Sequence, residues 1–391
     1  MNRLLKRAFD QGLAANGAAV ALANNAFDRM FRPGELVKSN LTPYDLIHEQ
    51  GLVTVRHYRP LKGRHIEMAD GSRVRIARER HPVPLVMIPP LAASSVIFDL
   101  LPQRSLVRFL LARGFDVYLV DWGDPEMDHS HYGIKDYTGE MLPAALQAVR
   151  ERSGQTEVSL FGWCMGGLFA LIYAGLSADP GVRNIVTVAS PVDSRAGGIA
   201  GRLMAALNGP ARLVRKYTNF RVHNIDPKAL LVPGWLNSMA FKLTNPVGSL
   251  MSYWDLLTRL WDREFVEAHT TTSRFLDRMM NYPGGIVQDF FVRVGVNNDL
   301  SRGRITVGDQ ESSFDRIQCS LLVYAGQADA IVTPAAAHRV MDLVKSQDKE
   351  FVVAPGGHMG VFAGSAAPAH VWQTAADWLA PRSAEQAVDI A

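Results

Sequence analysis

The sequence predicts an α/β protein with a mostly parallel sheet, helices on both faces and a large helical insertion. Two observations favour this fold class. Short apolar runs typical of buried strands alternate with segments whose apolar residues recur at helical spacing, and such alternation is typical of parallel strands joined by crossover helices. The alternation stops between 191 and 305, in a stretch rich in Met, Trp and Phe that is too long to be a bare loop.

Composition excludes several classes of protein. The chain has 391 residues, 41 Lys and Arg against 38 Asp and Glu, and 48% hydrophobic residues. This apolar content supports a packed core, and the interleaved charges form no basic patch for nucleic acid. Cys164 and Cys319 lie far apart without metal-ligand spacing, so we expect no disulfide, no metal and a reducing, cytoplasmic setting. The sequence has no run of about 18 uninterrupted apolar residues, so we expect no transmembrane segment.

An N-terminal helical region is expected at 1–44. It begins with positive charge and becomes rich in alanine. Asp10, Gln11 and Asn16 interrupt the apolar stretch, which argues against a signal peptide and favours an amphipathic helix. We expect this helix to pack on the body of the protein, on a partner or on an apolar surface.

The first part of the sheet core is expected at 45–190. Its strands are rich in Val, Leu, Ile and Tyr, and its first helix stops at Gly114, since glycine commonly follows a helix end. The expected strands cover 51–59, 84–90, 115–121, 158–161 and 185–189, and the expected helices cover 105–113, 139–152 and 166–176.

The remainder of the chain is expected to form a helical cap and then complete the sheet. We predict the cap at 191–305, the second part of the core at 306–382 and a tail at 383–391. Strands at 320–325 and 351–353 should alternate with helices at 335–344 and 367–379. The cap therefore divides the core into two parts of the sequence.

A sharp turn with a cysteine at its centre is predicted between a strand and a helix. The segment Gly162-Trp-Cys-Met-Gly-Gly167 follows the strand that ends at Phe161 and resembles the GxSxG nucleophile elbow of α/β hydrolases, with Cys164 in place of serine. Its small residues allow strand and helix to approach, and the helix N-terminus favours a thiolate. Cys164 is therefore the candidate nucleophile, although a tight turn around a merely buried cysteine would read the same.

A nucleophilic thiol needs a base and a group that orients the base. In α/β hydrolases these follow the nucleophile as an acid and then a histidine. Asp329 follows the strand 320–325 and His358 follows the strand 351–353, so both are expected at the same sheet edge as Cys164. The oxyanion hole is expected to use the backbone N–H of Met165 together with that of Leu91 or Ala92, in the loop after the strand at 84–90.

Taken together, the ordered motifs resemble the poly(hydroxyalkanoate) synthases, most closely the short catalytic subunits that work with a second subunit. They include Gly114-Phe-Asp-Val-Tyr-Leu-Val-Asp-Trp-Gly123, the GxCxGG segment, Ser190-Pro-Val-Asp193, Val232-Pro-Gly-Trp-Leu-Asn237 and Asn298-Asp-Leu-Ser-Arg-Gly303. The resemblance implies an acyltransferase of the α/β-hydrolase fold that polymerises 3-hydroxyacyl-CoA and releases CoA. It assigns Cys164 as acyl acceptor, His358 as general base and Asp329 as its partner.

The resemblance also implies particular partners. These are 3-hydroxyacyl-CoA and the growing polyester chain as substrates, an accessory synthase subunit or a second copy of the chain, and the surface of a polyester granule. The CoA thioester is a substrate, so no separate cofactor is expected. Two alternatives stay open from the residues. One is a cysteine-dependent hydrolase of thioesters, esters or lactones, and the other is a non-catalytic protein associated with granules.

Overall fold

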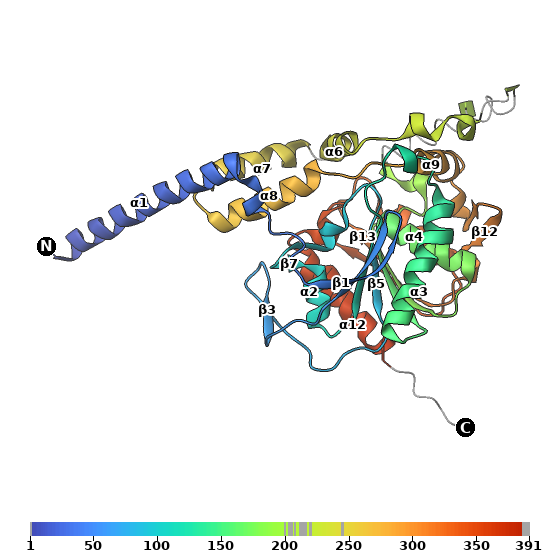
Figure 1. Ribbon diagram of the computed structural model, residues 1–391, viewed down its shortest axis with the longest axis horizontal. Coiled ribbons are helices and arrows are strands. Elements are labelled where there is room, and N and C mark those ends of the chain that lie inside the picture. Colours follow the sequence, from blue (N-terminus) through green and yellow to red (C-terminus); the bar gives the residue numbers. More distant parts are fainter. Residues whose placement is uncertain are drawn as a thin grey trace.

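An eight-stranded sheet forms the centre of the protein in the computed structural model (Figure 1). The strand order is β1-β2-β8-β5-β9-β10-β13-β14. The pairs β1/β2 and β2/β8 are antiparallel, and the other neighbouring pairs are parallel. The strands are β1 (Tyr44–Gln50), β2 (Val53–Tyr58), β5 (Leu85–Ile88), β8 (Val117–Asp121), β9 (Val158–Trp163), β10 (Val182–Val188), β13 (Ser320–Gly326) and β14 (Lys349–Ala354). The mostly parallel α/β sheet predicted from the sequence is thereby confirmed.

Helices cover both faces of this sheet. Figure 1 shows α2 and α12 on one side and α3 and α4 on the other. The strands β5 and β9 are buried along their whole length, which explains why they read as continuous apolar runs. The helices are α1 (Asn2–Phe31), α2 (Leu106–Ala112), α3 (Leu142–Ser153), α4 (Met165–Ser177), α6 (Gly234–Leu243), α7 (Pro246–Thr258), α8 (Arg263–Asp277), α9 (Gly284–Asp289), α10 (Pro334–His338), α11 (Gly360–Ala363) and α12 (Gln373–Arg382).

Part of the predicted cap and tail lies outside the residues that the structure describes. The predicted tail from 385 onward and most of 199–220 in the predicted cap are among these. The described residues are 2–198, 201, 206, 209–210, 217–218, 221–243 and 246–384.

Several elements differ from the sequence predictions. The strand β1 was not predicted, because it is an edge strand with polar residues and only partial burial. The helix expected at 335–344 is shorter, because α10 is followed by a tighter 3-10 turn (Arg339–Asp342), and apolar spacing does not distinguish the two. Three two-stranded ribbons were also missed: β3 (His65–Glu67) with β4 (Arg73–Arg75), β6 (Asp99–Leu101) with β7 (Arg104–Ser105), and β11 (Arg304–Val307) with β12 (Gln310–Ser313).

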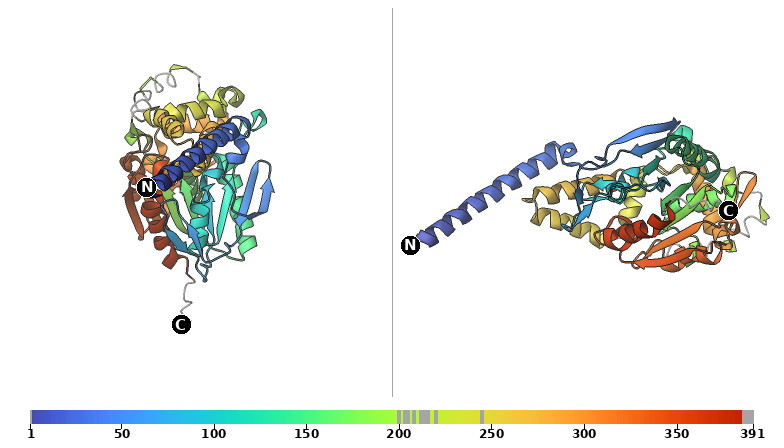
Figure 2. Two further views of the ribbon diagram at one scale, coloured as in Figure 1. Left: turned by 90° about the vertical axis from the view of Figure 1, so that its left-hand side faces the viewer. Right: turned by 90° about the horizontal axis from the view of Figure 1, so that it is seen from below.

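The long helix α1 is anchored to the cap near its C-terminal end. Arg29 donates to the Thr270 hydroxyl at 2.7 Å, and Arg263 of α8 pairs with Asp28 at 2.6 Å. The other end of α1 projects away from the body of the protein (Figures 1 and 2). Within the described part of the chain, no helix is long and apolar enough to cross a membrane.

Much of the apolar content of the cap faces outward. Trp235 is 66% exposed, Trp254 61% and Met251 50%, whereas Phe275 and Met279 are buried. The cap helices α6 and α7 therefore carry an exposed apolar face. Composition alone does not predict which face of a helix is buried.

Candidate active site

The turn between β9 and α4 holds Cys164 in a strained backbone conformation. Its φ of 52° and ψ of −117° lie in a region that residues with a side chain rarely adopt. The Cys164 N–H donates to the Val188 carbonyl at 2.8 Å, which fixes the turn to the neighbouring strand β10. This is the geometry of a nucleophile elbow, and it places the thiol at the edge of the sheet where the parallel strands end.

Close backbone contacts explain the glycines of the elbow. A Cβ atom on Gly166 would lie 2.0 Å from the Ile88 carbonyl oxygen, and one on Gly162 would lie 2.4 Å from the Gly167 Cα. These contacts pack α4 against both β9 and the end of β5. The glycines therefore allow the nucleophile to approach the loop that follows β5.

Replacement of Gly166 by alanine is expected to destabilise the fold by at least about 3 kcal/mol, because the new methyl group meets backbone that cannot move aside cheaply. Urea unfolding monitored by circular dichroism measures this. Gly34→Ala is the matched control, because a Cβ there has no neighbour within 4 Å. Equal stability of the two variants would contradict the close packing at the elbow.

Asp329 and His358 form a buried pair beside the elbow. The Nδ1 atom of His358 lies 2.8 Å from Asp329 Oδ2, and the two side chains are 9% and 0% exposed. The other carboxylate oxygen of Asp329 accepts the N–H groups of Ile331 and Val332, both at 2.8 Å. The carboxylate is therefore held from both sides and orients the imidazole so that Nε2 is left for the nucleophile.

The electrostatics of His358 link it to the thiol. Burial by itself lowers the pKa of His358, but the negative charge of Cys164 and the hydrogen bonds with Asp329 and Cys164 outweigh burial and raise this pKa to about 10. The imidazole therefore stays protonated at neutral pH and faces the Cys164 sulfur. The three residues that the sequence singled out thus lie together in a Cys-His-Asp arrangement.

The loop after β5 is braced next to the elbow. The Trp122 indole donates to the Pro89 carbonyl at 2.9 Å, the Ser95 hydroxyl donates to Asp121 at 2.6 Å, and the Met280 N–H donates to the Ala92 carbonyl at 2.9 Å. Within the described part of the chain, neither Leu91 nor Ala92 donates its N–H to another group. Their role in an oxyanion hole with the Met165 N–H remains a prediction.

One residue beside the thiol was missed by the sequence reasoning. The Tyr282 hydroxyl of the cap lies 3.2 Å from the Met165 sulfur. Burial first, and then the charge of Cys164, raises the pKa of Tyr282, so the phenol stays neutral. A backbone bridge between Val232 and Tyr282 holds this segment in the cap. No local signal marks Tyr282, because its position depends on the cap folding back over the core.

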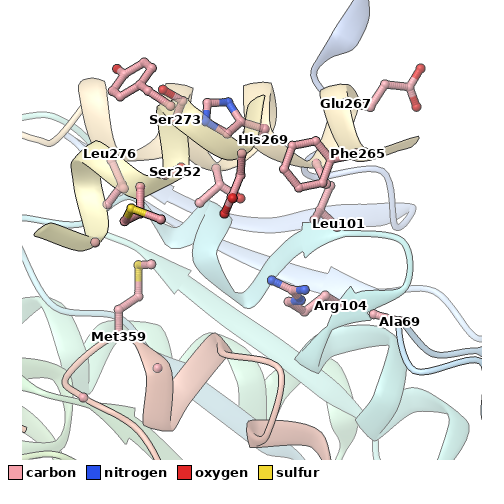
Figure 3. Close-up of a pocket in the computed structure, with 18 of the residues that line it drawn as sticks. Ala69, Leu101, Arg104, Ser252, Phe265, Glu267, His269, Ser273, Leu276 and Met359 are labelled. Carbon is pink, nitrogen blue, oxygen red and sulfur yellow. The ribbon is translucent and has the colours of Figure 1, made fainter. Parts of the chain in front are cut away.

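A cavity of about 1270 Å³ lies between the core and the cap and reaches His358. His358 and Met359 line one side of it, and Figure 3 shows the side chain of Met359 pointing into it. Helices α7 and α8 form the opposite wall. The volume exceeds that of most small-molecule pockets. Among the residues the structure describes, no cluster of three or more His, Cys, Asp or Glu could hold a metal ion.

Comparison with known families agrees with this architecture. The profile described as alpha/beta hydrolase fold matches residues 83–365. The chain belongs to the alpha/beta hydrolase fold family. The matched range includes the elbow, the Asp329 loop and the His358 loop, so every residue of the arrangement lies within the part shared with this family.

Relatives within this alpha/beta hydrolase family confirm the resemblance predicted from the motifs. The poly(3-hydroxyalkanoate) polymerase subunit PhaC of Haloferax mediterranei is 27% identical over 348 residues, which is 88% of this chain and 64% of the relative. The subunit of the same name from Allochromatium vinosum is 27% identical over 355 residues, covering 89% of this chain and 91% of the relative. The chain thus spans less than two thirds of the Haloferax protein and most of the Allochromatium protein.

Solved structures are more distant from this alpha/beta hydrolase. A monoacylglycerol lipase of Paleococcus ferrophilus is 18% identical, with a TM-score of 0.46, and the match covers 78% of this chain and 96% of the lipase. A soluble variant of monoglyceride lipase from Saccharomyces cerevisiae is 13% identical, with a TM-score of 0.47, covering 89% of this chain and 98% of the lipase.

Proposed function

We propose that the protein is an acyltransferase that polymerises 3-hydroxyacyl-CoA into polyhydroxyalkanoate and releases CoA. The observation that carries this proposal is a cysteine, instead of a serine, at the nucleophile elbow, in contact with the His358–Asp329 pair. Acyl transfer from a CoA thioester to a thiol makes another thioester, so the acyl group stays activated for a further transfer. The relatives named as polymerases support the same reaction class.

The first half of the proposed reaction loads the enzyme. The Cys164 thiolate attacks the thioester carbonyl carbon of 3-hydroxyacyl-CoA, and backbone N–H groups of Met165 and of Leu91 or Ala92 stabilise the oxyanion. Collapse of the intermediate breaks the bond to the CoA sulfur. His358 gives its proton to that sulfur, so CoA leaves as a thiol and the imidazole becomes neutral. The acyl group is then held on Cys164 as a thioester.

The second half uses the loss of charge on Cys164. Once the sulfur is acylated, its negative charge no longer raises the pKa of His358, while burial still lowers it. The neutral imidazole can therefore accept the proton of a chain-end hydroxyl as that oxygen attacks the thioester. Cys164 leaves as a thiolate and His358 is protonated again. His358 is therefore an acid while the Cys164 sulfur is negatively charged, in the first half, and a base once that charge is lost, in the second half.

The test is to incubate the purified protein with 3-hydroxybutyryl-CoA and with a longer 3-hydroxyacyl-CoA, to follow CoA release, and to identify the acyl product. We expect CoA release together with insoluble polyester. Free hydroxy acid as the only product would mean that the protein is a cysteine hydrolase. Absence of CoA release, with an accessory synthase subunit added as well, would contradict the proposed activity. The proposed reaction needs no cofactor beyond the CoA thioester itself.

We further propose that the polyester granule in the cytoplasm is where the protein acts, and that α1 contacts an accessory subunit or a second copy. The support is the projecting end of α1 and the exposed apolar face of α6 and α7, where Trp235 and Trp254 are more than half exposed.

Deletion of residues 1–30 is expected to abolish partner association in size-exclusion chromatography. The double variant Trp235→Ser with Trp254→Ser should weaken binding to polyester particles in a sedimentation assay. Unchanged partner association after the deletion would refute the contact through α1. Unchanged particle binding by the double variant would refute the contact through α6 and α7.

A further inference from the structure

The cavity beside His358 is lined by four cationic and four carboxylate side chains, and three of the four cations are in ion pairs. Lys38, Lys242, Arg259 and Arg104 are the Lys and Arg side chains among its lining residues. Lys38 lies 3.5 Å from Glu267, Arg259 lies 2.8 Å from Asp262, and Lys242 pairs with Asp277. Three of the four cations are therefore neutralised by carboxylates of the protein.

Arg104 is the exception. Among the described residues no carboxylate forms an ion pair with it, and its buried Nε atom has no hydrogen-bond partner. Burial lowers the pKa of Arg104 below its ordinary value, but the guanidinium remains charged at neutral pH. A half-buried and unpaired guanidinium is costly to keep, and an anion that binds beside it would remove this cost.

The place of Arg104 in the cavity indicates what kind of anion could reach it. Figure 3 shows Arg104 and Met359, the residue after His358, on opposite sides of the cavity floor. A ligand that reacts at Cys164 and also reaches Arg104 must therefore extend along the cavity. An acyl-CoA has this form, because its phosphates are separated from the thioester by the pantetheine arm. The polyester chain carries no phosphate.

A second unpartnered nitrogen lies on the cap side of the same cavity. His269 of α8 lines the cavity, and its buried Nδ1 atom has no hydrogen-bond partner among the described residues. Burial lowers the pKa of His269, so the ring is neutral at pH 7 and adds no charge of its own. The core wall thus supplies a cation and the cap wall a hydrogen-bonding group, which together suit a polar, anionic ligand.

From this arrangement we propose that Arg104 binds a phosphate group of the CoA moiety in the cavity that leads to His358. This rests on the proposed function, since it names the site that holds the leaving group of that reaction. Arg104 is then a residue that selects CoA thioesters over thioesters without phosphate. The other three cations of the cavity cannot take this role without breaking their ion pairs with carboxylates of the protein.

Calorimetric titration of CoA into the Cys164→Ala protein tests the proposal without any turnover. Arg104→Gln in that background is expected to weaken CoA binding about tenfold or more, as removal of a charge-assisted hydrogen bond does. Arg104→Lys should restore part of the affinity because it retains the charge. Titration with 3′-dephospho-CoA and with pantetheine identifies the phosphate: the ligand that lacks it should bind equally to both proteins.

Lys242→Gln is the matched control, because Lys242 lines the same cavity but is paired with Asp277. It should leave CoA affinity within about twofold, and thermal unfolding should show that all variants are folded. Equal binding of CoA by Arg104→Gln and the parent would overturn the proposal, even if the wild-type protein releases CoA from acyl-CoA. Failure of the parent itself to bind CoA would overturn the proposal too, and CoA release by the wild type then shows separately whether the proposed function stands.

Discussion

Cys164→Ala is expected to reduce CoA release from 3-hydroxyacyl-CoA by a factor of about 10³ or more, because Cys164 is the thiol beside His358 that would hold the acyl unit as a thioester. The measurement is the initial rate of CoA formation with the variant at the same concentration as the wild type. The side chain of Cys164 is small and half-buried, so the variant should remain folded by circular dichroism.

Cys319 provides the matched control for this experiment. It is the other free cysteine of the chain, and burial raises the pKa of its thiol to about 12, so it stays protonated and unreactive at neutral pH. Cys319→Ala should therefore keep CoA release within about twofold of wild type. Undiminished turnover by Cys164→Ala would refute the covalent mechanism, and loss of activity in a folded Cys319→Ala protein would refute the assignment of Cys164.

Cys164→Ser distinguishes transfer from hydrolysis at the same position. The elbow and the His358–Asp329 pair would be retained, but the acyl group would be held as an oxygen ester, which is less activated than a thioester. The serine is also a far weaker nucleophile than a thiolate. We therefore expect slow acylation with little or no polymer, so that a serine variant that makes polyester at the wild-type rate would contradict the need for a thioester.

The proximity of the three candidate catalytic residues could be predicted from sequence because each of them follows a strand of the parallel part of the sheet. Parallel strands end at one edge of the sheet, so Cys164 after β9, Asp329 after β13 and His358 after β14 had to be neighbours once the strands were recognised. The hydrogen bond between His358 and Asp329 follows from this topology. Chain order and strand position were therefore sufficient to predict that Cys164, Asp329 and His358 are neighbours.

The cap side of the site could not be predicted in this way. Tyr282 contacts Met165 although the two are separated by 117 positions in the chain, and the periodicity of the cap does not report such contacts. The same holds for Arg104, because nothing in its own segment shows that the folded chain leaves it without an ion-pair partner among the described residues. Local patterns specify elements and turns, whereas the surroundings of a cavity depend on how two parts of the chain pack.

His358→Gln is expected to lower CoA release by about 10³-fold, because it removes both the charge that faces the thiolate and the proton for the CoA sulfur. The sign of the pH effect follows from the raised pKa of His358. In the wild type the imidazolium persists at pH 7 and is lost only as the pH rises through about 10. This positive charge faces the Cys164 sulfur, and a neighbouring positive charge makes a cysteine more reactive.

Alkylation of Cys164 by iodoacetamide makes this charge measurable without substrate. The wild-type rate should be nearly constant from pH 7 to 9, since His358 keeps its proton throughout this interval. The rate of His358→Gln should be lower at pH 7 and rise steeply with pH as hydroxide ionises the thiol. A purely structural role for His358 would reduce turnover without this change of profile. Identical alkylation profiles for the two proteins would therefore refute the thiolate–imidazolium pair, on which the alternation of His358 between acid and base depends.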